Sequence, residues 1–425
     1  MLIYEQGTAD TVLTDDDLRA GLYAALDQLG PRRRVLLVPP DITRLHSRAG
    51  VLSCYAWQYY GDRLTDVLPA LGTHVAMTEA EIGAMFGPMP SDRFRVHDWR
   101  RDVMTLGTVP ADYVREVSGG AVDYAWPVQL NRLLVEGGFD LILSIGQVVP
   151  HEVVGMANHN KNILIGTGGP DSINKSHFLG AAYGMERIMG RVDTPVRRVL
   201  NYAATHFAQH LPIVYVLTVV GRDDQLALQT RGLFVGDGTE CFVRAAALSA
   251  KVNFQVVTEP FERVVVFLDP AEYKSTWLGN KSIYRTRMAL ADGGELIVLA
   301  PGLKQFGEDP QIDAVIRRYG YQGTPAILAA VERDEDLQNN LSGAAHLIHG
   351  SSEGRFRITY CPGHLSRAEV EAVHFQYADL ATMAARYDPA VLRDGYNTMA
   401  DGQQVFYISN PALGLWAAQQ RLDHS

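Results

Sequence analysis

The sequence has few cysteines, no long hydrophobic run and no amino-terminal export signal. Its three cysteines, Cys54, Cys241 and Cys361, are far apart and show no C-x-x-C spacing. They cannot form a structural zinc site by themselves, and they indicate a reducing compartment. No apolar stretch reaches the ~18 residues that span a membrane, and no basic segment precedes an apolar one at the amino terminus. We therefore expect a cytoplasmic protein with no membrane partner.

Positive charge is also scarce, because 38 Lys and Arg residues stand against 48 Asp and Glu residues, a formal net charge of −10. Nucleic acid binding needs a concentrated basic face. The nearest basic run, Arg32-Arg33-Arg34, precedes a predicted strand and fits a solvated turn, so we expect no nucleic acid partner. With 425 residues, of which 47% are hydrophobic and 20% charged, the chain is typical of a globular protein too long for a single core.

Apolar spacing predicts helices that alternate with buried strands. Thr14 caps a helix that stops at Gly30, and apolar strands follow at 35–38 and 141–146. Helix and strand alternate at least three times before residue 150, which indicates a doubly wound α/β sheet. The alternation restarts at 263–268, after Pro260. We therefore predict two α/β domains, 1–256 and 257–425, each with a mainly parallel sheet flanked by helices.

In the second domain, helical spacing covers 281–290, and Asp292-Gly293-Gly294 is expected to form a turn before a strand at 295–300. A further helix is predicted near 310–319, and a long one begins after a cap at Ser366. The final segment, 396–416, has no clear pattern.

Several polar residues fall where predicted strands end. Asp41 and Arg44 follow the strand at 35–38, His74 follows Gly72-Thr73, and His151 follows the strand at 141–146. Ligands of open α/β sheets bind beyond the carboxyl ends of the strands, and the planar guanidinium of arginine suits a carboxylate. The alternatives are that Asp41 and Arg44 only tie down their loop, and that His74 is a hydrogen-bonded structural residue.

The stretch from Pro150 to Gly190 concentrates further chemistry. Lys161 lies ten positions after His151, a glycine-rich turn follows, and His177 lies sixteen positions after the lysine. We expect His151 on the loop after a strand and His177 in the early turns of a helix, and these are places that commonly host ligands. The stretch therefore predicts a cofactor site.

The chemistry of these groups favours an acid as substrate. Arginine and lysine bind carboxylates, and two neutral histidines can each exchange a proton near pH 7. A base on either side of one carbon is what inversion of a stereocentre requires. The α C–H of a 2-hydroxy acid is too weakly acidic for imidazole, whereas hydride transfer avoids that difficulty. Side chains accept no hydride, so a cofactor is needed.

With these residues, the chain resembles the nickel-pincer nucleotide-dependent racemases and epimerases, the lactate racemase-like family. The shared motifs occur in the family's order and spacing: Asp41-Ile42-Thr43-Arg44, Gly72-Thr73-His74, His151, Lys161, His177, and later Lys281 before Gly293-Gly294. The resemblance covers nearly the whole chain. The segment 277–302 also looks like the branch of the family associated with sugar acids.

The resemblance implies a role for each motif residue. Lys161 and His177 would hold the nickel-pincer nucleotide (pyridinium-3,5-bisthiocarboxylic acid mononucleotide nickel), with Lys161 bonded through a thioamide in some members and His177 as a nickel ligand. His74 and His151 would be the catalytic acid-base pair. The substrate-binding residues would be Asp41, Arg44, Trp277 and Lys281.

The same resemblance implies an isomerase that inverts C2 of a small-molecule 2-hydroxy acid by hydride transfer, in a cleft between the two domains. The cofactor-synthesis enzymes of the cell would be partners, and an oligomer is left open. Leu278 stands where the lactate enzymes have glutamine, and the insert Glu152–Asn160 differs from theirs. Gln338, Asn339 and Asn340 offer hydrogen bonds where an aromatic residue is expected.

These departures favour an aldonic acid such as mannonate or gluconate, because a site built for hydroxyl groups rejects analogues that lack them. The alternatives are a racemase of lactate or another short 2-hydroxy acid, and a zinc-dependent hydrolase or lyase that uses His151, His159 and His177. A third alternative is a two-domain binding protein for an acidic metabolite.

Overall fold

The computed structural model describes residues 1–223 and 227–423, and these divide into two compact units. The first contains Met1–Tyr183 and Ile188–Asn253, and the second contains Gly184–Arg187 and the chain from Phe254 onward. The second unit therefore includes four residues that lie earlier in the chain than the rest of it. No helix in the described part of the chain is long and apolar enough to cross a membrane.

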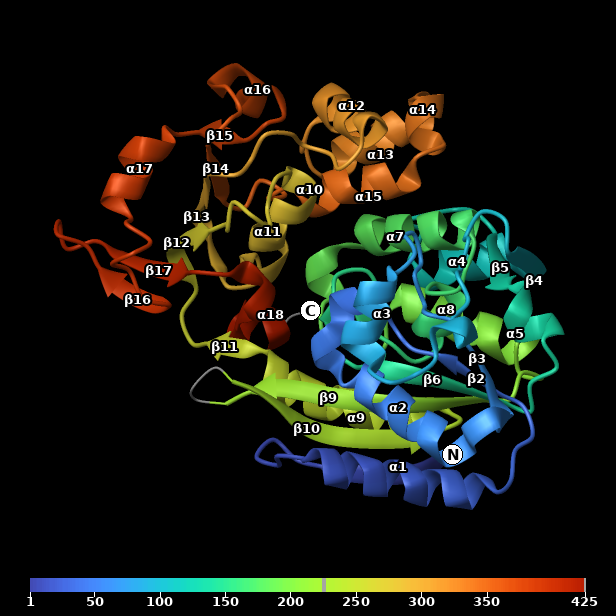
Figure 1. Cartoon of the computed structure of the whole chain (residues 1–425). Coiled ribbons are helices and arrows are strands. Elements are labelled where there is room, and N and C mark those ends of the chain that lie inside the picture. Colours follow the sequence, from blue (N-terminus) through green and yellow to red (C-terminus); the bar gives the residue numbers. More distant parts are fainter. Residues whose placement is uncertain (224–226, 424–425) are drawn as a thin grey trace. The chain divides into compact units, whose positions relative to one another are not determined.

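The first unit is built on a six-stranded sheet with strand order β1-β10-β9-β6-β2-β3 (Figure 1). Strands β9, β6, β2 and β3 run parallel. At one edge β10 pairs with β9 in the antiparallel direction, and β1 pairs with β10 in the antiparallel direction. The strands are β1 (Leu2–Gly7), β2 (Val35–Val38), β3 (Leu64–Val67), β6 (Leu141–Gln147), β9 (Ile213–Arg222) and β10 (Leu228–Gly236).

Both faces of this sheet are covered, which is why β2 and β6 are buried at every position. Helices α1 (Asp15–Leu29) and α2 (Ala49–Tyr60) pack their apolar sides on one face, where they share a core with Leu37, Leu143 and Val216. Helix α9 (Thr239–Asn253) packs along β9 and β10. Its Phe242 and the strand residue Tyr215 both contact the same imidazole ring, that of His159.

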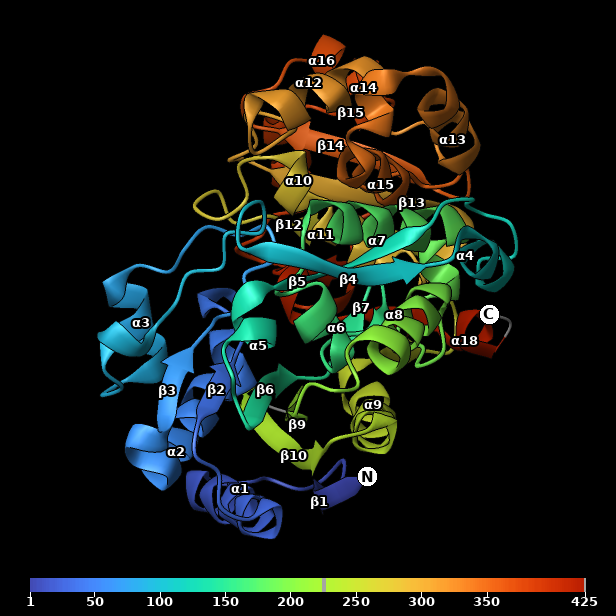
Figure 2. The same cartoon turned by 90° about the vertical axis from the view of Figure 1, so that its right-hand side faces the viewer.

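Further helices and short strands complete the first unit. The ribbon of β4 and β5 packs against α7 and α8 (Figure 2). These elements are α3 (Glu79–Phe86), β4 (Val103–Val109), α4 (Ala111–Val117), β5 (Trp126–Asn131), α5 (Arg132–Glu136), β7 (Pro150–His151), β8 (Gly155–Met156), α6 (Asn160–Leu164), α7 (Pro170–Tyr183) and α8 (Pro195–Phe207), with the 3-10 turns η1 (Ile42–Ser47), η2 (Gly61–Arg63) and η3 (Ser91–Arg93).

The second unit has its own six-stranded sheet, with strand order β15-β14-β13-β12-β17-β16. All of its pairings are parallel except that of β16 with β17. The strands are β12 (Phe261–Phe267), β13 (Leu290–Ala300), β14 (Arg357–Pro362), β15 (Gln376–Tyr377), β16 (Gly395–Thr398) and β17 (Gln404–Ile408); a separate parallel pair joins β11 (Gln255–Val257) to β18 (Trp416–Ala418). The predicted α/β class, with parallel-rich sheets and flanking helices, is confirmed.

The helices of the second unit include a cluster formed by α12 to α15 and a separate helix, α17, that packs on β13 and β14. Their bounds are α10 (Thr276–Gly279), α11 (Lys281–Thr286), α12 (Pro310–Tyr319), α13 (Thr324–Arg333), α14 (Glu335–Gln338), α15 (Leu341–His349), α16 (Arg367–Ala372), α17 (Leu380–Arg386) and α18 (Gln419–Asp423), with the 3-10 turns η4 (Met185–Arg187) and η5 (Pro411–Leu413).

Two local predictions for this unit are wrong. Asp292-Gly293-Gly294 was expected to form a turn but lies inside β13, where the register with β12 shifts between Phe261 and Arg263 and Gly293 has a φ of +80°. Asp292-Gly293-Gly294 therefore forms a bulge inside β13 and not a turn that precedes the strand. The helix capped at Ser366 was predicted to be long, but it ends at Ala372.

Candidate active site

Asp41 and His74 form a hydrogen-bonded pair beyond the ends of β2 and β3. Asp41 is 5% exposed and caps η1, accepting from the amide of Thr43. Its Oδ2 lies 2.6 Å from Nδ1 of His74. Burial raises the pKa of the Asp41 carboxyl, but hydrogen bonds from His74 and Thr43 outweigh burial and lower it. The carboxylate therefore holds the proton of His74 on Nδ1 and leaves a lone pair on Nε2.

The turn that carries His74 is tied to the segment after α6. The amide of Gly72 donates to the carbonyl of Gly166 at 2.8 Å, and the amide of His74 donates to the carbonyl of Leu71 at 2.9 Å. Gly72 has a φ of +56°, a conformation that favours glycine. The backbone thus links the position of His74 to the segment that follows Lys161.

His151 lies on β7, in a two-residue ribbon with β8, where a loop was predicted. It is 9% exposed, and its Nδ1 accepts a hydrogen bond from the amide of Val153 at 3.1 Å. Burial lowers the pKa of His151 well below its usual value; Glu152 opposes this shift, while Lys161 and other nearby cations add to it. The ring is therefore neutral at pH 7, and its proton is on Nε2.

Lys161 lies on α6, which is anchored to two central strands of the sheet, β2 and β6. The amide nitrogen of the Asn162 side chain donates to the carbonyl of Val38 on β2 and to Oγ of Ser144 on β6, both at 3.0 Å. Burial lowers the pKa of Lys161 to about 8, and the Arg44 guanidinium adds to the effect. Lys161 is therefore more readily deprotonated than an ordinary lysine, which makes its amine a better nucleophile.

His177 occupies the middle of α7, further along the helix than the predicted early turns. Its Nδ1 lies 2.8 Å from the carbonyl oxygen of Ile173, one turn earlier. The Nδ1–H therefore donates to that carbonyl, and Nε2 keeps a free lone pair on a ring whose orientation is fixed. This is the usual arrangement of a histidine that ligates a metal through Nε2.

The first unit brings six of the motif residues into one electrostatic network. Burial is the largest cause of the lowered pKa of His151, Lys161 and His177. The charge of Arg44 adds to the lowering at His151 and Lys161, and the charge of Lys161 adds to it at His177. Asp41, already paired with His74, also acts on Lys161. The six residues are Asp41, Arg44, His74, His151, Lys161 and His177.

The other two predicted residues, Trp277 and Lys281, belong to the second unit. Trp277 on α10 stacks on His346, with ring centroids 4.2 Å apart. His346 also hydrogen-bonds to the hydroxyls of Tyr284 and Tyr321 at 3.0 Å, and burial lowers its pKa to about 3. Lys281 is the first residue of α11.

Two of the amides proposed to offer hydrogen bonds serve local structure. The side chain of Asn340 caps α15, accepting from the amide of Gly343 at 3.0 Å, and Gln338 donates to the carbonyl of Glu332 at 3.3 Å. Leu278 lies on α10 beside Trp277. Gln338 and Asn339 are exposed, and Asn340 is half-buried.

Sequence reasoning gave no role to Glu152 and left that of His159 undefined. Oε2 of Glu152 lies 3.8 Å from Nδ1 of His151. His159 packs between Tyr215 and Phe242, with centroid distances of 4.0 and 5.1 Å. An acid next to a candidate catalytic histidine was the available signal for Glu152, whereas the contacts of His159 involve residues more than fifty positions away.

Arg197, on α8, is a second residue that the sequence did not reveal. It is 2% exposed and donates to the carbonyl of Met156 at 2.6 Å and to that of Asn158 at 3.3 Å, and it also bonds the side chain of Asn160. It therefore holds the segment that leads into Lys161. No nearby sequence pattern marks such a contact.

A metal site made only from protein ligands is not seen among residues 1–223 and 227–423, where no three His, Cys, Asp or Glu side chains are grouped to hold an ion. The aromatic packing of His159 also gives no support to a zinc site made with His151 and His177. One oriented imidazole, His177, fits a metal that is carried mainly by an organic group.

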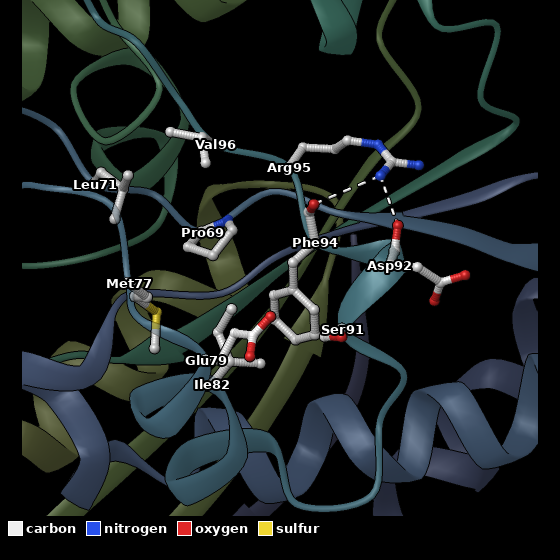
Figure 3. Close-up of a pocket in the computed structure, with 10 residues that line it drawn as sticks. All are labelled: Pro69, Leu71, Met77, Glu79, Ile82, Ser91, Asp92, Phe94, Arg95 and Val96. Carbon is white, nitrogen blue, oxygen red and sulfur yellow. Dashed lines mark hydrogen bonds between the residues drawn. The ribbon is translucent and has the colours of Figure 1, made fainter.

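A cavity of about 320 Å³ is lined by residues between Pro69 and Val96 (Figure 3). Leu71 and Met77, on either side of His74, contribute to its lining, and the Arg95 side chain stretches across one side and donates to the carbonyl of Asp92. The six motif residues are not among those that line it. The cavity is therefore lined by residues other than those proposed for the site.

Comparison with known proteins places this site in context. Residues 23–187 match the family described as the lactate racemase N-terminal domain. A curated lactate racemase from Thermoanaerobacterium thermosaccharolyticum is 25% identical over 246 residues, which is 55% of this chain and 51% of that protein. The chain thus matches about half the length of that relative in sequence.

Two solved structures share the fold over most of the chain. A protein from Thermotoga maritima has a TM-score of 0.78 and 25% identity, covering 96% of this chain and 99% of the other. The lactate racemase apoprotein from Thermoanaerobacterium thermosaccharolyticum has a TM-score of 0.67 and 18% identity, covering 96% and 91%. The similarity of fold therefore extends well beyond the similarity of sequence.

The parallel-rich α/β sheets share their fold with the lactate racemase apoprotein. The matched N-terminal segment and the curated relative support the lactate racemase-like family.

Proposed function

We propose that this protein is a nickel-pincer nucleotide-dependent racemase or epimerase that inverts C2 of a 2-hydroxy acid. The observation that carries this proposal is the Asp41–His74 pair, which leaves a base-ready Nε2 in the same network as Lys161, His177 and Arg44. A hydroxyl proton acceptor, a carboxylate-binding cation and a cofactor attachment point are the three functions that the reaction requires.

The residues of the first unit fit the cofactor. His177 presents one lone pair from a ring fixed by Ile173, and Lys161, with a pKa of about 8, offers a nucleophilic amine near neutral pH. Besides burial, the positive charges of Arg44 and Arg197 lower the pKa of Lys161. When bound, the cofactor would supply the hydride acceptor that side chains lack.

In this proposal, Arg44 binds the substrate carboxylate and orients C2, because its planar fork pairs with both oxygens. The Nε2 of His74 takes the proton of the 2-hydroxyl group, and Asp41 stabilises the imidazolium that results. His151 serves the opposite epimer. Trp277 and Lys281 are kept as substrate-binding residues on the strength of the family resemblance.

We propose an aldonic acid such as gluconate or mannonate as the substrate. The support comes from the sequence, where Leu278 replaces the glutamine of lactate enzymes and the segment 277–302 looks like the sugar-acid branch. Lactate, or another short 2-hydroxy acid, is the second candidate, because the curated relative is named a lactate racemase.

The test is to produce the protein together with cofactor-building enzymes and to offer D-gluconate, D-mannonate and lactate separately. Inversion at C2 is followed by chiral chromatography. We expect gluconate and mannonate to interconvert; turnover of lactate alone would reverse the choice of substrate. His210→Gln, which changes an exposed histidine outside the network, is the control that should match wild type, whereas His74→Gln should be inactive.

Mass spectrometry of the same preparation addresses the cofactor independently of turnover. We expect a mass increase on the peptide that contains Lys161, or bound nucleotide with nickel released on denaturation. A protein that binds neither nucleotide nor nickel after such co-expression would contradict the proposal.

A further inference from the structure

The hydrogen bonds of this structure favour opposite tautomers for the two candidate acid-base histidines. Asp41 accepts the Nδ1 proton of His74, so its Nε2 is a proton acceptor. The amide of Val153 donates to Nδ1 of His151 at 3.1 Å, so the neutral His151 ring carries its proton on Nε2. In this state only His74 is ready to receive a proton through Nε2, and His151 is ready to donate a hydrogen bond.

A reversible epimerase needs each histidine to act as the acceptor in turn, once for each epimer. For Nε2 of His151 to become an acceptor, the ring proton must move to Nδ1. There it would face the N–H of Val153, which also donates. A second acceptor beside Nδ1 is therefore required.

Glu152 supplies an oxygen at that place. Its Oε2 lies 3.8 Å from Nδ1 of His151, so a movement of about 1 Å would bring it within hydrogen-bond distance. Its side chain is 32% exposed, compared with 11% for His151. The carboxylate of Glu152 is therefore closer to solvent than the ring that it faces.

The same carboxylate acts on the other bases of the network. Burial lowers the pKa of His151, Lys161 and His177, and the negative charge of Glu152 opposes that lowering at all three, while Arg44 adds to it at His151 and Lys161. Glu152 is thus the counter-charge shared by the buried basic side of the site, as Asp41 is the counter-charge of His74.

We infer that Glu152 is a positioning residue that accepts the Nδ1 proton of His151 and thereby converts this ring from a hydrogen-bond donor into a base. This inference rests on the proposed function for its catalytic meaning. The tautomer itself, however, is a property of the protein without cofactor or substrate.

The decisive experiment uses apoprotein with ¹⁵N-labelled histidine and long-range ¹H–¹⁵N spectra at neutral pH. The signals of His151 are assigned by their loss in His151→Gln. In wild type we expect its Nδ1 shift to lie between the protonated and unprotonated values, because both neutral tautomers exchange. In Glu152→Gln we expect the shift to move to the unprotonated value, with the rest of the spectrum unchanged. Equal Nδ1 shifts in the two proteins would overturn the inference.

Two further variants separate the role of Glu152 from a general effect of charge. Glu152→Asp keeps the carboxylate and should retain part of the Nδ1–H population. Glu136→Gln removes an exposed carboxylate paired with Arg132 at 3.5 Å and should leave the His151 shifts as in wild type. A shift of His151 in Glu136→Gln as large as that in Glu152→Gln would count against the inference.

Kinetics of the cofactor-loaded enzyme give the catalytic readout. We expect Glu152→Gln to lower kcat about tenfold or more, with KM within about twofold of wild type, because the substrate contacts remain. An unchanged kcat would overturn the proposed role of Glu152 in catalysis. Complete inactivity of wild type towards all three acids would instead contradict the proposed function, and the apoprotein shifts would still decide the role of Glu152.

Discussion

The carboxylate of Asp41 is almost fully buried, whereas the imidazole of His74, only 2.6 Å away, has a side chain that is 57% exposed. Asp41 thus anchors the His74 ring through Nδ1 and leaves Nε2 available. Such an arrangement resembles the carboxylate that orients the base of a hydrolase triad.

Asp41→Asn tests this arrangement. The amide keeps the shape but loses the charge that fixes the Nδ1 proton and stabilises the imidazolium, so kcat of the loaded enzyme should fall by at least about tenfold. Thr43→Val is the matched control, because it removes another hydrogen bond to Asp41 and leaves the contact with His74. A loss in Thr43→Val as large as in Asp41→Asn would show that loop geometry, rather than the charge, is what matters.

Lys161→Met should stabilise the apoprotein at pH 7. Burial lowers the pKa of Lys161 from 10.5 to about 8, so folding opposes the charged form and the unfolded chain binds the proton more strongly. The penalty is fully present below pH 8 and fades as the pH rises towards 10.5. Urea unfolding at pH 7 and pH 10 should therefore show a gain at pH 7 that shrinks at pH 10. Lys304→Met, at an exposed position, should show little change at either pH.

His159→Phe should fold and retain turnover, because the ring packs between Tyr215 and Phe242 as an aromatic group. His159→Ala should lower the free energy of unfolding by roughly 2–4 kcal/mol, since it leaves a cavity. Urea denaturation measures the stability of both variants, and elemental analysis measures the metal that they bind. A protein that loses its metal in His159→Phe would revive the zinc-site interpretation.

Glu186→Gln should destabilise the second unit by about 3 kcal/mol at pH 7. The carboxylate of Glu186 binds Arg287 at 3.0 Å and Arg355 at 2.7 Å, and the Arg287 side chain is only 4% exposed. Burial raises the pKa of Glu186, but the two guanidinium groups outweigh it and lower it below 4.5. Its contribution is therefore present above pH 4.5 and is lost as the pH falls through the lower folded value.

Chemical denaturation at pH 7 and at pH 3.5 measures this effect, and the difference between wild type and Glu186→Gln should shrink at the lower pH. Asp16→Asn, which removes an exposed pair with Arg19, should cost less than about 1 kcal/mol. Equal losses for Glu186→Gln and Asp16→Asn would contradict the prediction.

The parts of the fold that the sequence predicted are those set by neighbouring residues. Thr14 and Ser366 each form a capping box with an acid three positions on, so both halves of the signal lie in one short window. The apolar strands at 35–38 and 141–146 were also found, because burial on both faces gives a continuous apolar run.

The parts that the sequence did not predict depend on distant partners. The bulge at Gly293 arises from the register between β12 and β13, and a pair of glycines alone does not distinguish a bulge from a turn. Helix α7 ends at Tyr183, where Gly184 takes a φ of +110°, although Met185 and Ile188 continue the apolar spacing.

The candidate site shows the same division. Motif spacing selected the residues that we propose for the site. One of them, Lys161, lies on α6, which the side chain of Asn162 ties to β2 and β6. Which nitrogen of each histidine carries a proton depends on single contacts with Asp41, Val153 and Ile173. Such contacts leave no periodic trace in the sequence.

The four residues from Gly184 to Arg187 belong to the second unit although they lie far ahead of the rest of it in the chain. A truncated gene for residues 254–425 would therefore produce a polypeptide without Glu186, in which the guanidinium groups of Arg287 and Arg355 have lost a carboxylate that both of them bind. Anyone who dissects this protein into fragments would need to supply that short peptide in trans, or graft it onto the new amino terminus, to recover a stable C-terminal piece.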